Sequence, residues 1–441
     1  MQLAAATGYA RRLGVLSGTL SVVGGIIGSG IFLNPAIVAQ RTGSATLTLG
    51  AWVIGGVVAL LGAFIYAELG RRAPRAGGGY VYLRDAFGPL PAFLSGWVLL
   101  LAVATGAIAA VSVTFANYLL ALAGGPAHLA LPIAASAILM LTVLNILGVA
   151  PGAYTQNLFT LLKLAALAGL LVVALLPHAP AAAAPPALPA TEHGFAGGLG
   201  VIGTALVPVL FAYGGWQQTN YIAEEIREPE RTLPRALLLG VLIVVAVYLL
   251  ANVAYLRALG VEGLAASPAP AAETMQARFG SGGRTFIAVG IVVSTFGFLD
   301  LVILASPRVY QAMAADGVFP RRFAQLHPRF RTPVTALLAQ AAWALALVSW
   351  GTYGELLDWV VFADWITFGS VALTLVVLRR RQESGGGFRD PLYPVSVGLF
   401  VLAAIWVVVG SISSNPANAL KGVLMVAAGV PAYRFWRRRR T

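Results

Sequence analysis

Long apolar segments alternate with short polar or basic ones along the whole chain. A helix needs about 20 predominantly apolar residues to cross the hydrocarbon core of a bilayer, and the sequence contains twelve such stretches. They lie near residues 14–40, 45–70, 88–120, 128–149, 155–176, 196–226, 234–258, 282–316, 332–350, 353–378, 393–411 and 416–435. The pattern predicts an all-α integral membrane protein with twelve transmembrane helices, in which residues 1–441 form a single transmembrane domain.

The segments between these stretches are short, apart from PHAPAAAAPPALPATEHG at residues 177–194. Its content of proline and alanine disfavours a packed helix, and we expect an extended crossing on the outer side. The first apolar stretch is too long for a cleavable signal peptide, so we expect it to stay in the membrane. Any functional site must then lie within the helical bundle.

Glycines interrupt two of the apolar stretches, in GGIIGSGIFL at residues 24–33 and in LFAYGGWQQTN at residues 210–220. Each break falls part-way along the first helix of a five-span block, and an odd number of spans inverts the second block. Paired broken helices in corresponding positions indicate a transporter site between inverted repeats. We expect one repeat at about 14–176, a second at about 196–378, and two extra helices at about 393–435.

A broken helix suits a zwitterionic ligand without any charged side chain. Its free N–H groups carry partial positive charge and attract a carboxylate, whereas its free carbonyls attract an ammonium group. The competing interpretation is that the glycines only allow helices to pack closely, since Gly24 and Gly28 have small-xxx-small spacing. The second break at the matching place favours the ligand site.

Composition and charge agree with a membrane protein. Hydrophobic residues make up 59% of the chain and charged residues 10%, against about 25% charged in soluble domains. With the N-terminus inside, Lys163 lies within a span, outer segments hold Arg41, Arg257, Arg278, Arg284 and Lys421, and every other lysine and arginine is inside. This asymmetry predicts cytoplasmic termini and explains the net charge of +13 without nucleic acid.

Two other functional classes find little support. The chain has no cysteine, and its four histidines fall in predicted loops, so no metal site or cofactor is expected. A membrane-embedded enzyme would need convergent catalytic groups, and neither HExxH nor GxSxG is present. A channel would need an open polar pore or a filter loop, whereas paired broken helices favour an occluded site.

Several motifs resemble the amino acid–polyamine–organocation superfamily, most closely its L-type amino acid transporter branch. They are GSGIF, FAYGGW followed by EEIREPERTLPRA, TLLKLAAL, and PRVYQAMAADGVFP followed by RTPVTAL, and the resemblance runs almost end to end. It implies a LeuT-like 5+5 inverted repeat and amino acid transport by alternating access.

The same resemblance assigns roles to the two breaks. It implies that Gly28, Ser29 and Gly30 bind the substrate carboxylate, and that Ile27 and the backbone of Phe211, Ala212 and Tyr213 face its amino group. Gly214, Gly215 and Trp216 would shape the side-chain pocket, with Trp216 or Phe211 closing over the ligand. Lys163 would stand in for a sodium ion, reaching carbonyls near the first break; snorkelling to the inner surface is the alternative.

Acidic residues inside the spans depart from the L-type pattern. Either acid could pair with Lys163, bind a proton or select a cationic substrate group. Asp300 is the better candidate, and the alternative for Asp364 is that it only caps or pairs locally. Glu68 is expected to be structural, as are Glu224 and Glu225 through inner arginines such as Arg231.

The expected activity is sodium-independent exchange of small to medium neutral L-amino acids across the cell (inner) membrane. Proton-coupled symport and a cationic amino acid carrier stay open as alternatives because of Asp300 and Asp364. Animal members of the branch join a heavy chain through an outer-loop cysteine. A chain without cysteine cannot form that disulfide, so the expected partners are the amino acid and the lipid bilayer.

Overall fold

The computed structural model describes residues 9, 11–175, 195–350, 353–381, 387–414 and 416–438. All regular elements in these ranges are helices, and the only extended pairing there is a single parallel bridge between Leu13 and Ile226. Eight of the described helices, or continuous helical segments, are long and apolar enough to cross a membrane, and the bent pair α1 and α2 makes a ninth. Helices α9, α14 and α17 occupy the three remaining expected spans. The segment 177–194, for which we expect an extended crossing, lies outside the described residues.

The helices of the first half follow the predicted spans closely. Their bounds are α1 (Val15–Ile26), α2 (Gly30–Thr42), α3 (Ala45–Arg72), α4 (Gly79–Phe87), α5 (Pro89–Val98), η1 (Leu99–Val103), α6 (Ala104–Ala123), η2 (Ala127–Leu129), α7 (Ala130–Ile146) and α8 (Val149–Leu175). Of these, α5, η1 and α6 form one continuous span.

The second half begins with another interrupted span, made of α9 and α10. Its elements are α9 (Phe195–Tyr213), α10 (Gln218–Tyr221), η3 (Ala223–Glu225), α11 (Pro229–Ala266), α12 (Pro270–Ala305), α13 (Pro307–Ala315), η4 (Arg321–Ala324), α14 (Val334–Trp350), α15 (Tyr353–Arg381), α16 (Val395–Ser414) and α17 (Pro416–Arg438).

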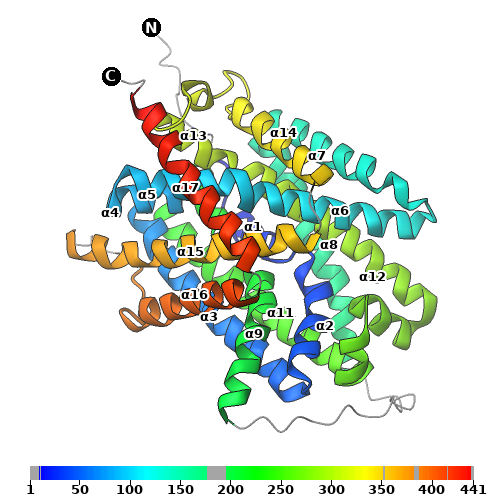
Figure 1. The fold of residues 1–441 in the computed structure, drawn as a ribbon. Helices are drawn as coiled ribbons and strands as arrows, with labels where there is room; N and C mark the ends of the chain where they lie inside the picture. The colour runs from blue at the N-terminus through cyan, green and yellow to red at the C-terminus, as the bar shows by residue number, and fades with distance from the viewer. Residues whose placement is uncertain are drawn as a thin grey trace.

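The interrupted helices lie at the centre of the bundle (Figure 1). Helix α1 packs against α8, α11 and α12, and α9 packs against α2 and α3. Further contacts join α11 to α3 and α12 to α8. Helices of the first half are therefore interleaved with helices of the second, and the two breaks are brought together between them.

Two long helices are kinked close to positions where the hydropathy pattern predicts the end of a span. Helix α11 is kinked at Gly260, where φ is 69°, and α12 at Gly280, where φ is 62°. Both φ values lie in the left-handed region that glycine adopts easily. The predicted span 234–258 ends just before the kink at Gly260, and the predicted span 282–316 begins just after the kink at Gly280. In each helix the glycine separates the apolar part from a more polar extension.

Glu225 pairs with an inner arginine, as expected, but its partner is Arg308 and not the suggested Arg231. Glu225 binds Arg308 at 2.9 Å, with both side chains fully buried, whereas the suggested partner, Arg231, lies 3.8 Å from Glu228. Sequence proximity favoured Arg231, but the turn at η3 directs Glu225 into the bundle toward the end of α12. Glu68 is structural in its contacts, since it binds Arg72 and Arg379.

Candidate functional site

The first break separates α1 from α2, which meet at a bend of 42°. The chain leaves helical geometry at Ile27, and α2 begins again at Gly30. The first turn of a helix leaves its N–H groups without intrahelical partners, so the amides at Gly30 and Ile31 face the break. The last carbonyls of α1 point toward the same region from the other side. The first break therefore presents donors and acceptors together.

Lys163 binds the acceptors at the first break. Its Nζ, which is fully buried, donates to the carbonyl of Ile27 at 2.7 Å and to that of Gly24 at 3.1 Å. Ser294 of α12 adds its hydroxyl, 3.2 Å from the Ile27 carbonyl. The expected reach of Lys163 to carbonyls near the break is present, and snorkelling to the surface is ruled out by its burial. Nζ of Lys163 thus sits at the C-terminal end of α1, where the helix dipole favours a positive charge.

The second break covers the residues between Tyr213 and Gln218 and carries no charged side chain. The amide of Gly214 donates to the Phe211 carbonyl at 3.1 Å, and that of Gly215 donates to Oε1 of Gln217 at 3.0 Å. Gly215 has φ +121°, and a Cβ there would collide with the carbonyl of Gly25. Glycine is therefore required at this position, both for its φ and because the two broken helices touch there.

The glycines of the first break divide between packing and ligand access. A Cβ on Gly24 would overlap the side chains of Gln156 and Thr160, so Gly24 serves helix packing. A Cβ on Gly30 would lie 2.9 Å from Cα and Cβ of Ala212. Gly30 also borders the central cavity. Close helix packing therefore explains Gly24, whereas both close packing and access for a ligand explain Gly30.

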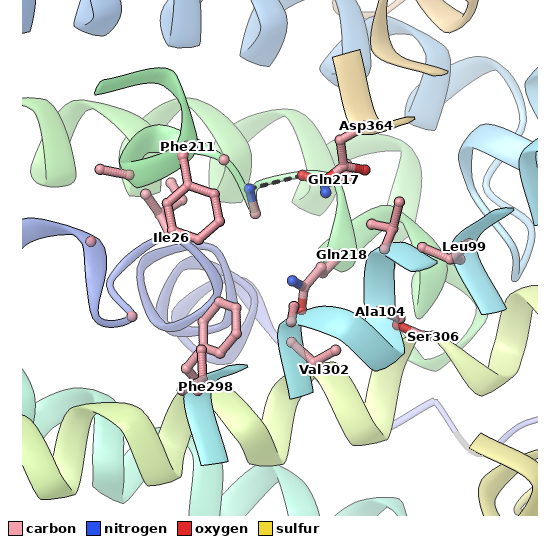
Figure 2. A pocket seen from close by; sticks show the side chains of 18 of the residues that line it. Ile26, Leu99, Ala104, Phe211, Gln217, Gln218, Phe298, Val302, Ser306 and Asp364 are labelled. Atoms are coloured by element: carbon pink, nitrogen blue, oxygen red, sulfur yellow. Dashed lines mark hydrogen bonds between the residues drawn. The ribbon is translucent and has the colours of Figure 1, made fainter. Parts of the chain in front are cut away.

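A cavity of about 70 Å³ lies between the breaks. Since one water needs about 10–15 Å³, the cavity holds on the order of five waters, comparable with the non-hydrogen atoms of alanine or serine. Figure 2 shows Phe211 and Phe298 near Ile26 on one side, and Asp364 beside Gln217 on another. The wall from the third span includes Leu99 and Ala104, at the ends of a π-helical turn. Such turns occur often at functional sites.

Most residues assigned to the site by the sequence reach this cavity. Its lining includes Gly28, Ser29, Gly30, Phe211, Ala212, Gly214 and Gly215. Three assigned residues do not line it: Ile27, Tyr213 and Trp216. The Ile27 carbonyl accepts hydrogen bonds from Lys163 and Ser294.

Trp216 and Tyr213 point into the protein instead of covering a ligand. Trp216 is fully buried and packs its ring against Tyr66, Phe368 and Phe400. The Tyr213 hydroxyl donates to the carbonyl of Trp52 at 3.2 Å. Of the two aromatic residues expected as alternatives to close over a ligand, Trp216 does not line the cavity in this structure. Phe211 lines the cavity, together with Phe298 of α12.

The two intramembrane acids lie in different surroundings. Asp300 is fully buried and accepts a hydrogen bond from Nδ2 of Asn145 at 2.8 Å, whereas Lys163 bonds the carbonyls of α1. The suggested Asp300–Lys163 ion pair is absent from the part of the chain that the structure describes. Asp364, for which local pairing was the alternative, lines the central cavity. The sequence showed that each span contains an acidic residue, but it did not show which way that side chain points.

Comparisons with known proteins cover nearly the whole chain. The family model described as "Amino acid permease" matches residues 13–430. The serine/threonine exchanger SteT of Bacillus subtilis is 32% identical, over 97% of both chains. The mouse b(0,+)-type amino acid transporter 1 is 32% identical, over 97% of this chain and 88% of its own. The human large neutral amino acids transporter small subunit 2 is 31% identical, over 96% and 80% respectively.

Proposed function

The chain belongs to the amino acid permease family and is a multi-pass membrane transporter of amino acids, and we propose that it exchanges small to medium neutral L-amino acids without sodium. The observation that carries this proposal is the cavity between the two broken helices, with residues and glycines of both breaks on its walls. SteT, named as a serine/threonine exchanger, covers the same length of chain and supports exchange of small substrates.

The substrate backbone is recognised by main-chain groups. The carboxylate binds the N–H groups at Gly28, Ser29 and Gly30, where the N-terminus of α2 is electropositive. The amino group binds the carbonyls at the end of α9, near Phe211 and Ala212. Because both partners belong to the backbone, this half of the site accepts any L-amino acid and leaves selection to the rest of the cavity.

Lys163 makes sodium unnecessary at the first break. The ammonium group of Lys163 on the carbonyls of Gly24 and Ile27 supplies the positive charge that a bound cation would otherwise bring. The first break is then held together in each step of the transport cycle by a covalently attached charge. We accordingly propose that uptake is coupled to counter-transport of another amino acid.

The cavity favours small side chains. Its volume of about 70 Å³ suits an amino acid with a short side chain, and Phe211 and Phe298 occupy one side. Gln218 and Ser306 also line it and offer hydrogen bonds to a hydroxyl group. Alanine, serine and threonine fit this combination of size and polarity.

The orientation follows from the charge distribution. We propose that the termini and the arginine-rich loops face the cytoplasm, in the cell (inner) membrane, by the positive-inside rule. We further propose one transmembrane domain with repeats at about 14–176 and 196–378 and two added helices at about 393–435. Without cysteine, the chain forms no disulfide to a heavy chain.

Counterflow tests the proposal directly. Purified protein in liposomes is given labelled alanine outside, with or without unlabelled serine inside. Exchange predicts much faster uptake into the preloaded vesicles, with saturation and competition. Proton symport is the second candidate because the carboxyl of Asp364 lines the cavity. Equal rates in loaded and empty vesicles, both accelerated by acid outside, would favour symport and contradict exchange.

A further inference from the structure

The central cavity contains one carboxyl group among the residues described as lining it, that of Asp364. Asp364 belongs to α15, which supplies Trp365 and Phe368 to the same wall. Carboxylates inside membrane-spanning segments are costly and usually mark a functional site. The backbone recognition described above makes no use of it.

Asp364 makes no hydrogen bond or ion pair within the described residues. Two fully buried cations of the bundle are engaged elsewhere: Lys163 by the carbonyls of α1, and Arg308 by Glu225. Asp300 offers the contrast, since it is fully buried, bonded to Asn145, and absent from the lining of the cavity. Of these two acids, only Asp364 can meet a ligand.

The other side of Asp364 borders a second cavity, of about 10 Å³, which is room for a single water. Tyr66, Tyr80 and Tyr221 are among its walls. Burial and the neighbouring Asp316 raise the pKa of the Tyr80 phenol, so Tyr80 stays neutral. This side therefore offers Asp364 polar neighbours but no positive charge.

We propose that Asp364 is a specificity-determining residue that binds a protonated amino group on the substrate side chain, so that the site also accepts short diamino acids. The backbone of such a substrate binds the broken helices, and its side-chain ammonium group bonds the Asp364 carboxylate. A charge-assisted bond of this kind is stronger than a neutral one. Asp364 has no hydrogen bond or ion pair among the described residues, so an incoming cationic group supplies the partner that it lacks. The inference rests on the proposed transport function.

Isosteric pairs of competitors test it. Uptake of labelled alanine into proteoliposomes is inhibited with 2,4-diaminobutyrate against norvaline, and with ornithine against norleucine. The members of each pair differ by an ammonium group in place of a methyl group. We expect the wild type to favour the diamino member of at least one pair by about tenfold or more, because a polar site strongly rejects an analogue that leaves it unpaired.

Two variants locate the effect. Asp364→Asn keeps the shape of the side chain and removes its charge. In this variant the diamino acid should inhibit alanine uptake no better than its neutral isostere does. Asp300→Asn is the matched control and should retain the wild-type preference, whatever it does to the absolute rate. Should Asp364→Asn prove unstable, Asp364→Ser serves the same comparison. Thermal stabilisation of detergent-solubilised protein by each competitor gives a second readout that does not need transport.

The outcomes separate this inference from the transport function. If the wild type takes up alanine but favours neither diamino acid, or if Asp364→Asn keeps the preference, the proposal for Asp364 is wrong. A dependence of alanine uptake on a proton gradient without any preference for diamino acids would make Asp364 a proton carrier and would also overturn it. Absence of all amino acid uptake by the wild type would contradict the proposed function instead.

Discussion

The two broken helices face each other across one cavity, yet they are stabilised in different ways. At the first break, the carbonyls of Gly24 and Ile27 are bonded by the ammonium group of Lys163. At the second break the hydrogen bonds come from neutral groups. The Gly215 amide donates to the Gln217 side chain, and the Ala212 carbonyl accepts from the hydroxyl of Tyr248. Charge is thus confined to one break.

This difference fits the proposed division of roles. The first break must present N–H groups to a carboxylate while its own carbonyls stay compensated, and a fixed cation achieves this without a dissociable ion. The second break must keep carbonyls available for an ammonium group, and a permanent cation there would compete with the substrate. Tyr248 connects the two breaks, since its hydroxyl lies 3.1 Å from the carbonyls of both Ile26 and Ala212.

The largest effect is expected where the breaks touch. Gly30→Val should abolish uptake, because the Cβ alone would lie 2.9 Å from Ala212 and the branched atoms would enter the cavity. Uptake of labelled alanine into proteoliposomes measures it, with gel filtration confirming that the variant is folded. Gly50→Val is the control, since no atom lies within 4 Å of a Cβ at that position. Normal uptake by the Gly30 variant would contradict the site.

Removing the charge from the first break should have the next largest effect. Lys163→Gln loses two charge-assisted bonds, each worth about 1.5–3 kcal/mol, and we expect uptake to fall by about a hundredfold or more. The matched change at the second break is Gln217→Ala, which removes a neutral bond of about 1 kcal/mol and should reduce uptake less. Equal losses in the two variants would show that the breaks do not differ as described.

A smaller effect is expected at the residue shared by both breaks. The Tyr248 hydroxyl has one proton and can donate to only one of its two carbonyl neighbours at a time. Tyr248→Phe should therefore cost about 1 kcal/mol, seen as roughly fivefold slower uptake or weaker substrate binding. Tyr255→Phe is the control, because its acceptor, the Ile31 carbonyl, lies within the regular helix α2. A larger loss in the control would argue against the special role of Tyr248.

No effect is expected from sodium. Because Lys163 supplies the cation at the first break, replacing external sodium by choline should leave the initial rate of alanine uptake unchanged. The measurement is best made in parallel with the Lys163 variant, whose transport has lost that charge. A strong dependence of the wild type on sodium would place an ion site elsewhere in the bundle and remove the reason given for Lys163.

Hydropathy and glycine placement in the sequence determined the helical architecture of this protein. Long apolar stretches have one stable outcome in a bilayer, since only helices satisfy their own backbone groups there, and glycine marks where such a helix can be interrupted. For the same reason the two breaks and a site between them were predictable from local motifs. The contact of Lys163 with the carbonyls of Gly24 and Ile27 joins residues 139 and 136 positions apart, and it was expected only from the resemblance to the transporter superfamily.

The tertiary structure alone decided which side chains face the cavity. Asp300 and Asp364 both stand in apolar helices, and a helix surrounded by lipid and other helices lacks the polar face that would reveal its rotation. Packing of α12 against α7 directs Asp300 to Asn145, whereas α15 presents Asp364 to the centre. The turn at Gly215 likewise sent Trp216 away from the site. Helix rotation is set by contacts between segments far apart in sequence, and no local pattern encodes it.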